Sequence, residues 1–154
     1  MKIPKKFLLA SHGTDGARAA ERLALSRCPR GGRLIHFVVV PDFWKGMMGD
    51  DWLNNASTQI AFGEYIESTL QAEIRDHVRR VERAARKRGV RYAVEVVFGK
   101  PADCLAARLE RGGVDLVVLG SPRPKGRTGF RSRMLTDALL RAARVPLLIA
   151  PHPT

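Results

Sequence analysis

Short apolar runs alternate with longer amphipathic stretches along this chain. Five runs are rich in Val, Leu and Ile and end at Gly, Pro or polar residues, as strands buried on both faces do. They cover residues 6–11, 34–40, 92–98, 115–119 and 145–150. The stretches between them repeat apolar residues every three or four positions, which predicts helices. These helices are expected at 17–27, about 59–88, 102–111 and 132–143.

The alternation of strands and helices predicts repeated βαβ units in a single α/β domain that spans residues 1–154. Right-handed crossovers then give an open parallel sheet of five strands with helices on both faces. In such sheets ligands bind beyond the carboxyl ends of the strands, where the strand order reverses. The turns that follow the first four strands are therefore the candidate ligand sites.

The segment 42–58 breaks this pattern. It holds both tryptophans and two methionines, Met47 and Met48, and it is long for a connection. We expect it to form a lid over the ligand edge or a surface for a partner. The alternative is a packed loop that closes the edge of the sheet.

Composition adds one strong feature, a formal net charge of +12 from 27 Lys and Arg against 15 Asp and Glu. The excess favours anionic partners without identifying one. Much of it lies between Arg75 and Arg88, where the first interpretation is a solvated helix face. No apolar run approaches the roughly 20 residues that cross a bilayer, and we expect a cytoplasmic protein.

Three stretches of the chain resemble the universal stress protein family. Gly99 to Ala102 matches the family's G-x-P turn, and Val114 to Ser121 matches its D-L-I-V-M-G-S strand. Leu140 to Ile149 matches its closing L-R-x-A-x-x-P-V-L-V strand. The resemblance covers nearly the whole chain apart from segment 42–58. It implies a Rossmann-like fold, related to adenine nucleotide alpha hydrolases, with strand order 3-2-1-4-5.

The glycine motif of ATP-binding relatives is incomplete in this chain. Those relatives carry G-x-x-G, nine residues, and then Gly followed by Ser or Thr, so that backbone N–H groups reach the phosphates. An ungapped alignment keeps Gly126 but places Arg123, Arg133 and Met134 at the other motif positions. The relatives also carry an Asp after the first strand, where this chain has His12.

Two interpretations of the basic loop, residues 122–131, stay open. Its arginines could grip phosphates as bidentate donors, or the loop could be solvated. The tentative ligand-binding residues follow from the strand ends, the loop and the resemblance. They are Ser11, His12, Gly13, Phe37, Val39, Gly99, Gly120, Ser121, Arg123, Gly126 and Arg133. ATP or AMP is the cofactor that the resemblance suggests.

Catalytic chemistry has little support in the sequence. Hydrolysis needs a positioned base and, in most cases, a metal carboxylate, and isolated acids such as Asp15 and Asp42 are more often caps or surface residues. No histidine pair has metal-ligand spacing, and His36 is expected to be a core residue of the second strand. Cys28 and Cys104 are interpreted as reduced thiols. We therefore predict no metal and no enzyme, while weak ATP hydrolysis stays open.

The resemblance implies a homodimer that pairs through the last strand. Its interface would use Val145, Leu147, Leu148 and Ile149. Three functions remain in view, in this order. The first is a stress-response binding or signalling module that does not take ATP in the usual way. The second is an ATP or AMP binder with an arginine-containing pocket. The third is a basic domain for an acidic protein or nucleic acid, of which nucleic acid is disfavoured because the loop lacks interleaved aromatics.

Overall fold

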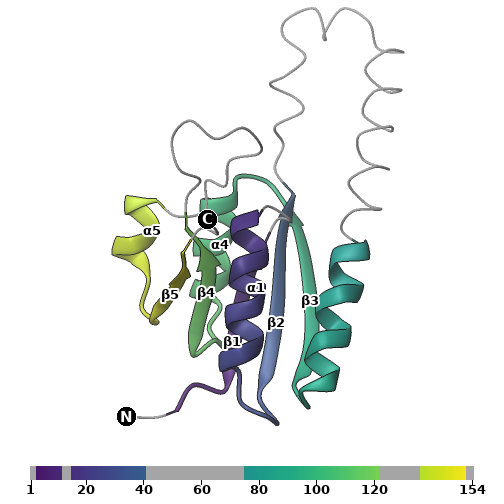
Figure 1. The fold of residues 1–154 in the computed structure, drawn as a ribbon. Coiled ribbons are helices and arrows are strands. Elements are labelled where there is room, and N and C mark those ends of the chain that lie inside the picture. Colours follow the sequence, from purple (N-terminus) through teal and green to yellow (C-terminus); the bar gives the residue numbers. More distant parts are fainter. Residues whose placement is uncertain (1–2, 12–14, 41–74, 122–135, 152–154) are drawn as a thin grey trace, which may run out of the picture.

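A computed structural model describes residues 3–11, 15–40, 75–121 and 136–151 of the chain. Its five strands form one parallel sheet in the order β3-β2-β1-β4-β5, which confirms the predicted topology (Figure 1). The strands are β1 (Lys6–Ser11), β2 (Arg33–Val40), β3 (Arg91–Phe98), β4 (Leu116–Gly120) and β5 (Leu147–Ala150).

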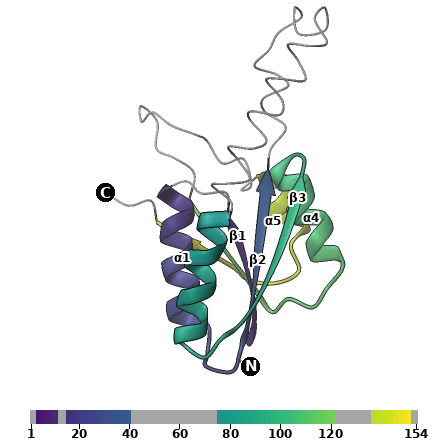
Figure 2. The same ribbon diagram turned by 90° about the vertical axis from the view of Figure 1, so that its right-hand side faces the viewer.

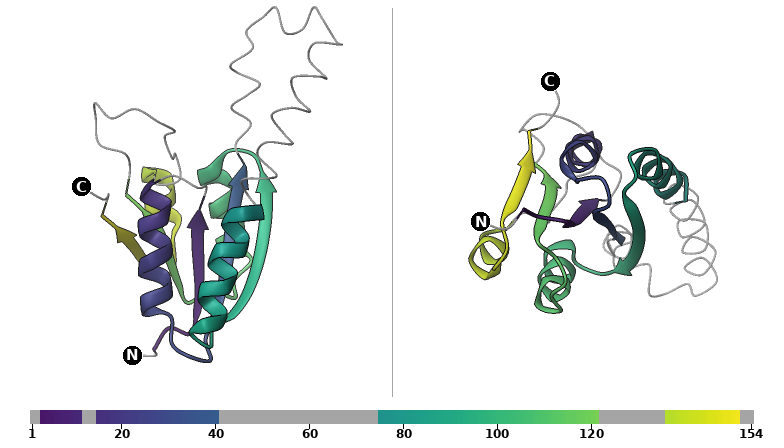
Figure 3. Two further views of the ribbon diagram at one scale, coloured as in Figure 1. Left: turned by 45° about the vertical axis from the view of Figure 1, so that its right-hand side comes forward. Right: turned by 90° about the horizontal axis from the view of Figure 1, so that it is seen from below.

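Helices cover both faces of this sheet, as the pattern predicts. The helix α1 (Asp15–Arg27) and a helix over residues 75–87, called the 75–87 helix below, lie side by side on one face. The helices α4 (Pro101–Glu110) and α5 (Asp137–Ala142) lie on the other face (Figures 2 and 3). The segment 42–58 and residues 59–74 of the predicted long helix lie outside the described residues.

Side chains alternate between two hydrophobic cores along the central strands, because successive strand residues point to opposite faces. Phe7 and Leu9 join the core under α1 and the 75–87 helix. Leu8 and Ala10 join the core under α4 and α5. This alternation explains why β1 reads as a continuous apolar run: both of its faces are covered.

Two predicted boundaries near the end of the chain are wrong. The last helix begins at Asp137 and not near residue 132, because the Thr136 hydroxyl oxygen caps it by accepting a hydrogen bond from the Leu139 N–H at 3.1 Å. The last strand begins at Leu147 and not at Val145. Pro146 precedes it and has no N–H to donate to the ladder, although its carbonyl accepts from Val117.

Two polar contacts hold the elements in place. The Asp115 carboxylate accepts hydrogen bonds from the backbone N–H groups of Lys5 and Lys6 at 3.1 and 3.0 Å, which ties the start of β1 to β4. On the far face, the buried Arg108 donates from Nε to Glu95 at 2.7 Å, which ties α4 to β3. The first contact lies at the amino ends of β1 and β4, opposite the carboxyl ends that form the predicted ligand edge, and the second lies in the middle of β3.

Candidate functional site

The strand order reverses between β1 and β4, and the carboxyl ends of these strands form the candidate edge. β1 pairs with β2 on one side and with β4 on the other, in parallel register. β1 ends at Ser11 and β4 at Gly120, so these two residues terminate adjacent strands. Open α/β sheets bind ligands at such a position, where the next helices in the chain, here α1 and α5, lie on opposite faces of the sheet.

Gly120 and Ser121 are held firmly at this edge. Gly120 is in register with Ala150 of β5, and the Ser121 N–H donates to the Ala150 carbonyl at 2.9 Å. Both residues are half-buried and thus reachable from the edge. A glycine here lets a ligand approach the backbone closely. The structure therefore brings Ser11, Gly120 and Ser121 to one place, as the strand-end rule predicts.

Gly99 lies farther along the same edge, after β3, and is separated from β1 by β2. Its φ of +144° belongs to a region that favours glycine, and a Cβ there would meet the Cys104 sulfur at 3.0 Å. The glycine turns the chain directly into α4, which has Lys100 at its N-cap and Pro101 in its first turn. Gly99 thus shapes the entry to α4.

The remaining predicted site residues fall into two groups. Phe37 and Val39 lie in the core that faces α4 and α5, with 2% and 1% of their surface exposed. Their side chains pack within this core. The others lie outside the described residues, namely His12, Gly13, Arg123, Gly126 and Arg133.

A second polar constellation lies beneath α1 and the 75–87 helix. His36 of β2 is fully buried, and its Nδ1 lies 2.7 Å from the Tyr92 hydroxyl of β3. Its ring meets the ring of His77 edge-on, with 4.8 Å between centroids. The His77 Nδ1 lies 3.0 Å from the Glu21 carboxylate, and Arg80 donates to the same carboxylate at 3.1 Å. These five residues, called the buried polar cluster below, come from α1, β2, the 75–87 helix and β3.

Burial sets the protonation of this cluster. It lowers the pKa of His36 to about 3, with smaller contributions from the neighbouring His77 and Arg80. Burial also raises the pKa of Glu21, although the Arg80 hydrogen bond and charge oppose it. Burial raises the pKa of Tyr92 as well, with smaller contributions from Glu82 and Glu21. At neutral pH His36 is therefore uncharged, and its Nε2 has no hydrogen-bond partner among the described residues.

The buried polar cluster joins four elements and does not open onto the β1–β4 edge residues. Sequence reasoning placed His36 in the core, which is confirmed, but did not find the cluster around it. The available signal was the helical spacing of His77, Val81 and Ala85, which puts the histidine on the buried line of its helix. Among the described residues, no group of His, Cys, Asp and Glu is arranged to hold a metal ion.

The chain matches the family model described as the universal stress protein family over residues 4–151. The chain belongs to the universal stress protein family. None of the curated proteins compared with it matches. Within the described part of this universal stress protein, no helix has both the length and the apolar character needed to cross a membrane.

Solved structures share the fold at low sequence identity. The universal stress protein UspA from Lactobacillus plantarum is 16% identical, with 94% of this chain and 95% of that chain covered and a TM-score of 0.67. A family protein from Arabidopsis thaliana with AMP bound is 14% identical, with 98% and 94% covered and a TM-score of 0.65. A universal stress protein in complex with cAMP is 18% identical, with 99% and 100% covered and a TM-score of 0.57.

Proposed function

We propose that this universal stress protein is a non-catalytic, cytoplasmic binding module of the stress response that does not take ATP in the usual way of its family. The observation that carries the proposal is the mismatch between scaffold and loop. The scaffold is intact, because Gly120 and Ser121 are fixed at the end of β4 by β5. The loop that follows has Arg123 and Arg133 where ATP-binding relatives have glycines.

The physical consequence concerns how a phosphate is held. Glycines allow a phosphate to contact backbone N–H groups directly, since no Cβ stands between them. An arginine at such a position adds bulk where the phosphate approaches and replaces backbone donors with a long charged side chain. A pocket of this kind selects anions by charge and loses the close backbone fit that the complete motif gives to a triphosphate.

A second candidate is nucleotide binding by the modified pocket. Two similar structures hold AMP and cAMP, and this chain keeps Gly120, Ser121 and Gly126 of the family pattern. In that function the arginines supply the phosphate contacts as charge-assisted donors. A monophosphate demands fewer backbone contacts than a triphosphate, so AMP and cAMP are the nucleotides to compare with ATP.

A thermal-shift titration separates the two candidates. Nucleotide-stripped protein is titrated with ATP, AMP and cAMP, with and without magnesium. A ligand that binds only the folded state adds about 2.7 kcal/mol at 100 times its Kd, which moves the midpoint visibly. Gly126→Asp places a carboxylate in the loop, and Ala107→Asp, on the exposed side of α4, is the matched control.

The outcomes point in opposite directions. A saturable shift that Gly126→Asp abolishes and Ala107→Asp retains would establish nucleotide binding in the modified pocket. If ATP alone gave that shift, the first proposal would be overturned. The absence of any shift at millimolar nucleotide would support the first proposal and refute the second.

We also propose that two copies pair through β5. Among the described strands, β5 lies at an edge and pairs only with β4. Ile149 is 38% exposed on it, and Val145, Leu147 and Leu148 are half-buried. An unpaired apolar edge promotes association, and pairing of two β5 strands covers it. Light scattering should then give twice the chain mass of 17.1 kDa.

A further inference from the structure

The surface at α1 and the 75–87 helix is hollowed. A concavity of about 400 Å³ is lined by both helices. A second one of about 440 Å³ has its described lining on the 75–87 helix and adjoins the first at Arg80 and Ala84. The two together are called the interhelical groove. Its described lining comes from α1 and the 75–87 helix, which lie on one face of the sheet (Figure 2), and it includes none of Ser11, Gly120 and Ser121. It is therefore a separate place from the edge on which the proposed function rests.

Positive charge dominates this groove. Six cations line it, against two carboxylates, Glu21 and Asp76. The cations are Arg18, Arg22, Arg79, Arg80, Arg83 and Lys87. Glu21 is already paired with Arg80 and is only 6% exposed, so it offers little compensation at the surface. Of the remaining cations, none forms an ion pair with another described residue.

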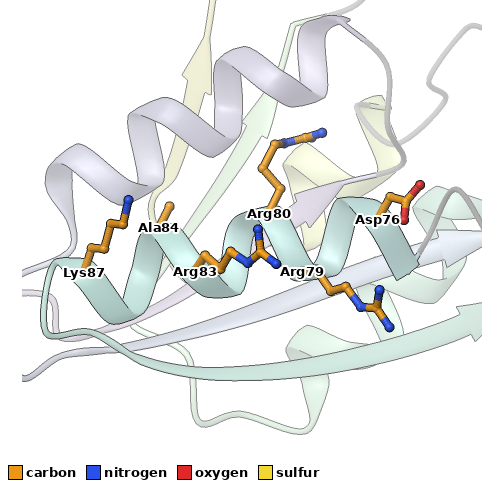
Figure 4. A pocket seen from close by; sticks show the side chains of 6 residues that line it. All are labelled: Asp76, Arg79, Arg80, Arg83, Ala84 and Lys87. Atoms are coloured by element: carbon orange, nitrogen blue, oxygen red, sulfur yellow. The ribbon is translucent and has the colours of Figure 1, made fainter.

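The cations are spread along the groove and do not converge. Arg79, Arg83 and Lys87 follow one another at four-residue intervals, which is about 6 Å along a helix axis per step. Figure 4 shows Lys87, Ala84 and Arg80 on the side of the helix that faces α1, whereas Arg79 points away from that side. A single compact anion meets few of these groups. An extended partner with charges repeated at a similar interval meets most of them.

The floor of the groove is apolar. Leu25 and Ala84 are half-buried there, and Val81 is buried beneath them. The described lining contains no aromatic side chain on which a nucleic-acid base could stack. An amphipathic helix fits both features, because carboxylates four residues apart match the cation interval while small apolar residues cover the floor.

We propose that the interhelical groove binds an acidic amphipathic helix of a partner protein. The α1 cations contact one side of that helix and the 75–87 helix cations contact the other. Binding of this kind is driven by exposed charges, so it weakens as salt rises. The inference does not rest on the proposed function, since the β1–β4 edge contributes nothing to the groove.

The test uses fluorescence anisotropy on the full chain. The probe is a labelled 15-residue peptide designed as an amphipathic helix. Glu occupies every fourth position, a second row of Glu lies beside the first along the helix, and Ala and Leu form an apolar stripe. Arg83→Glu/Lys87→Glu reverses two exposed groove cations that form no ion pair with another described residue. Arg30→Glu/Arg144→Glu makes the same change in net charge at exposed positions outside the groove.

We expect the groove variant to weaken peptide binding about tenfold or more, because two attractions become two repulsions. The control variant should weaken it by less than about threefold, since screened charges outside the groove act only through net charge. A peptide of the same composition with its glutamates in one block should bind more weakly than the periodic one.

Three results would overturn the proposal. Equal losses in the two variants would show that net charge, and not the groove, attracts the peptide. A peptide that fails to bind at millimolar concentration would remove the site altogether. Tighter binding of a 15-nucleotide single strand or a 15-base-pair duplex than of the peptide, lost in the groove variant, would assign the groove to nucleic acid. Circular dichroism of each variant confirms that it is folded before any comparison.

Discussion

The His36 imidazole should make the fold acid-sensitive, and the effect can be worked out from its surroundings. Burial lowers the pKa of His36 from 6.5 to about 3 in the folded chain. Its charged form would lie beside His77 and Arg80, with Glu21, Tyr92 and Glu82 as the other charged or titratable groups identified around the cluster. The perturbation is His36→Asn, because the Asn side-chain amide can accept from the Tyr92 hydroxyl or donate to it but cannot titrate.

The sign and size follow from linkage. Between pH 6.5 and 3, His36 binds a proton in the unfolded chain but not in the folded one. The free energy of unfolding therefore falls as the pH falls through this window, and it is unaffected well above pH 6.5. From pH 7.5 to pH 5 the loss from this one group is about 2 kcal/mol. The raised pKa of Glu21 acts in the opposite sense, since the folded carboxyl takes up a proton more readily than the unfolded one.

The assay is urea unfolding at pH 7.5 and pH 5, followed by far-ultraviolet circular dichroism. Between these pH values the wild type should lose about 2 kcal/mol more than His36→Asn. Glu21 and His77 are present in both proteins, so their contributions cancel in the difference. His36→Asn should be less stable at pH 7.5, because the smaller side chain leaves a cavity. Equal pH dependence in the two proteins would refute the assignment of His36 as a buried neutral base.

Two further predictions concern the polar contacts that tie α4 to β3 and β1 to β4. Arg108→Ala should lower the free energy of unfolding by about 1–3 kcal/mol, because it leaves the partly buried Glu95 carboxylate without its close partner. The control Arg111→Ala removes only an exposed pair at 3.9 Å and should change the free energy of unfolding by less than about 0.5 kcal/mol. Equal effects of the two variants in urea titrations would contradict this account. Asp115→Ala leaves two backbone N–H groups at the start of β1 without their shared acceptor, and it should lower the free energy of unfolding by about 1–2 kcal/mol. Hydrogen exchange at the Lys6 amide should then be faster, and an unchanged exchange rate would show that the contact is dispensable.

The architecture was predictable because each element carries its own local signal. The strands are continuous apolar runs, and most of their bounds lie within one residue of the predicted ones. The boundary errors arose where one side chain decided the end. Thr136 caps the last helix through its hydroxyl, which periodicity alone does not reveal. The position of Gly120 and Ser121 at the carboxyl edge follows from the topology of the sheet. This part of the candidate site was therefore also predictable from the sequence.

The buried polar cluster and the interhelical groove were not predictable, because both depend on which elements become neighbours. Glu21 and Arg80 are 59 residues apart, and His36 and Tyr92 are 56 residues apart. Helical periodicity assigns the arginines of the 75–87 helix to a solvated face. It does not show that α1 lies beside that face and turns it into one wall of a groove. For Phe37 and Val39 the sequence correctly predicted a place in the second strand, but it could not show that both side chains face the core.

The two candidate binding places attract anions with different residues, and this difference allows a ligand to be assigned. At the β1–β4 edge the described groups are the backbone and Gly120, and the arginines of the adjoining loop supply the proposed anion contacts. In the interhelical groove the contacts are exposed side-chain charges of α1 and the 75–87 helix. Salt screens charged contacts at both places, so ionic strength alone does not tell the two apart. A ligand held at the edge should lose affinity in Gly126→Asp and keep it in Arg83→Glu/Lys87→Glu, and a ligand held in the groove should respond in the opposite way.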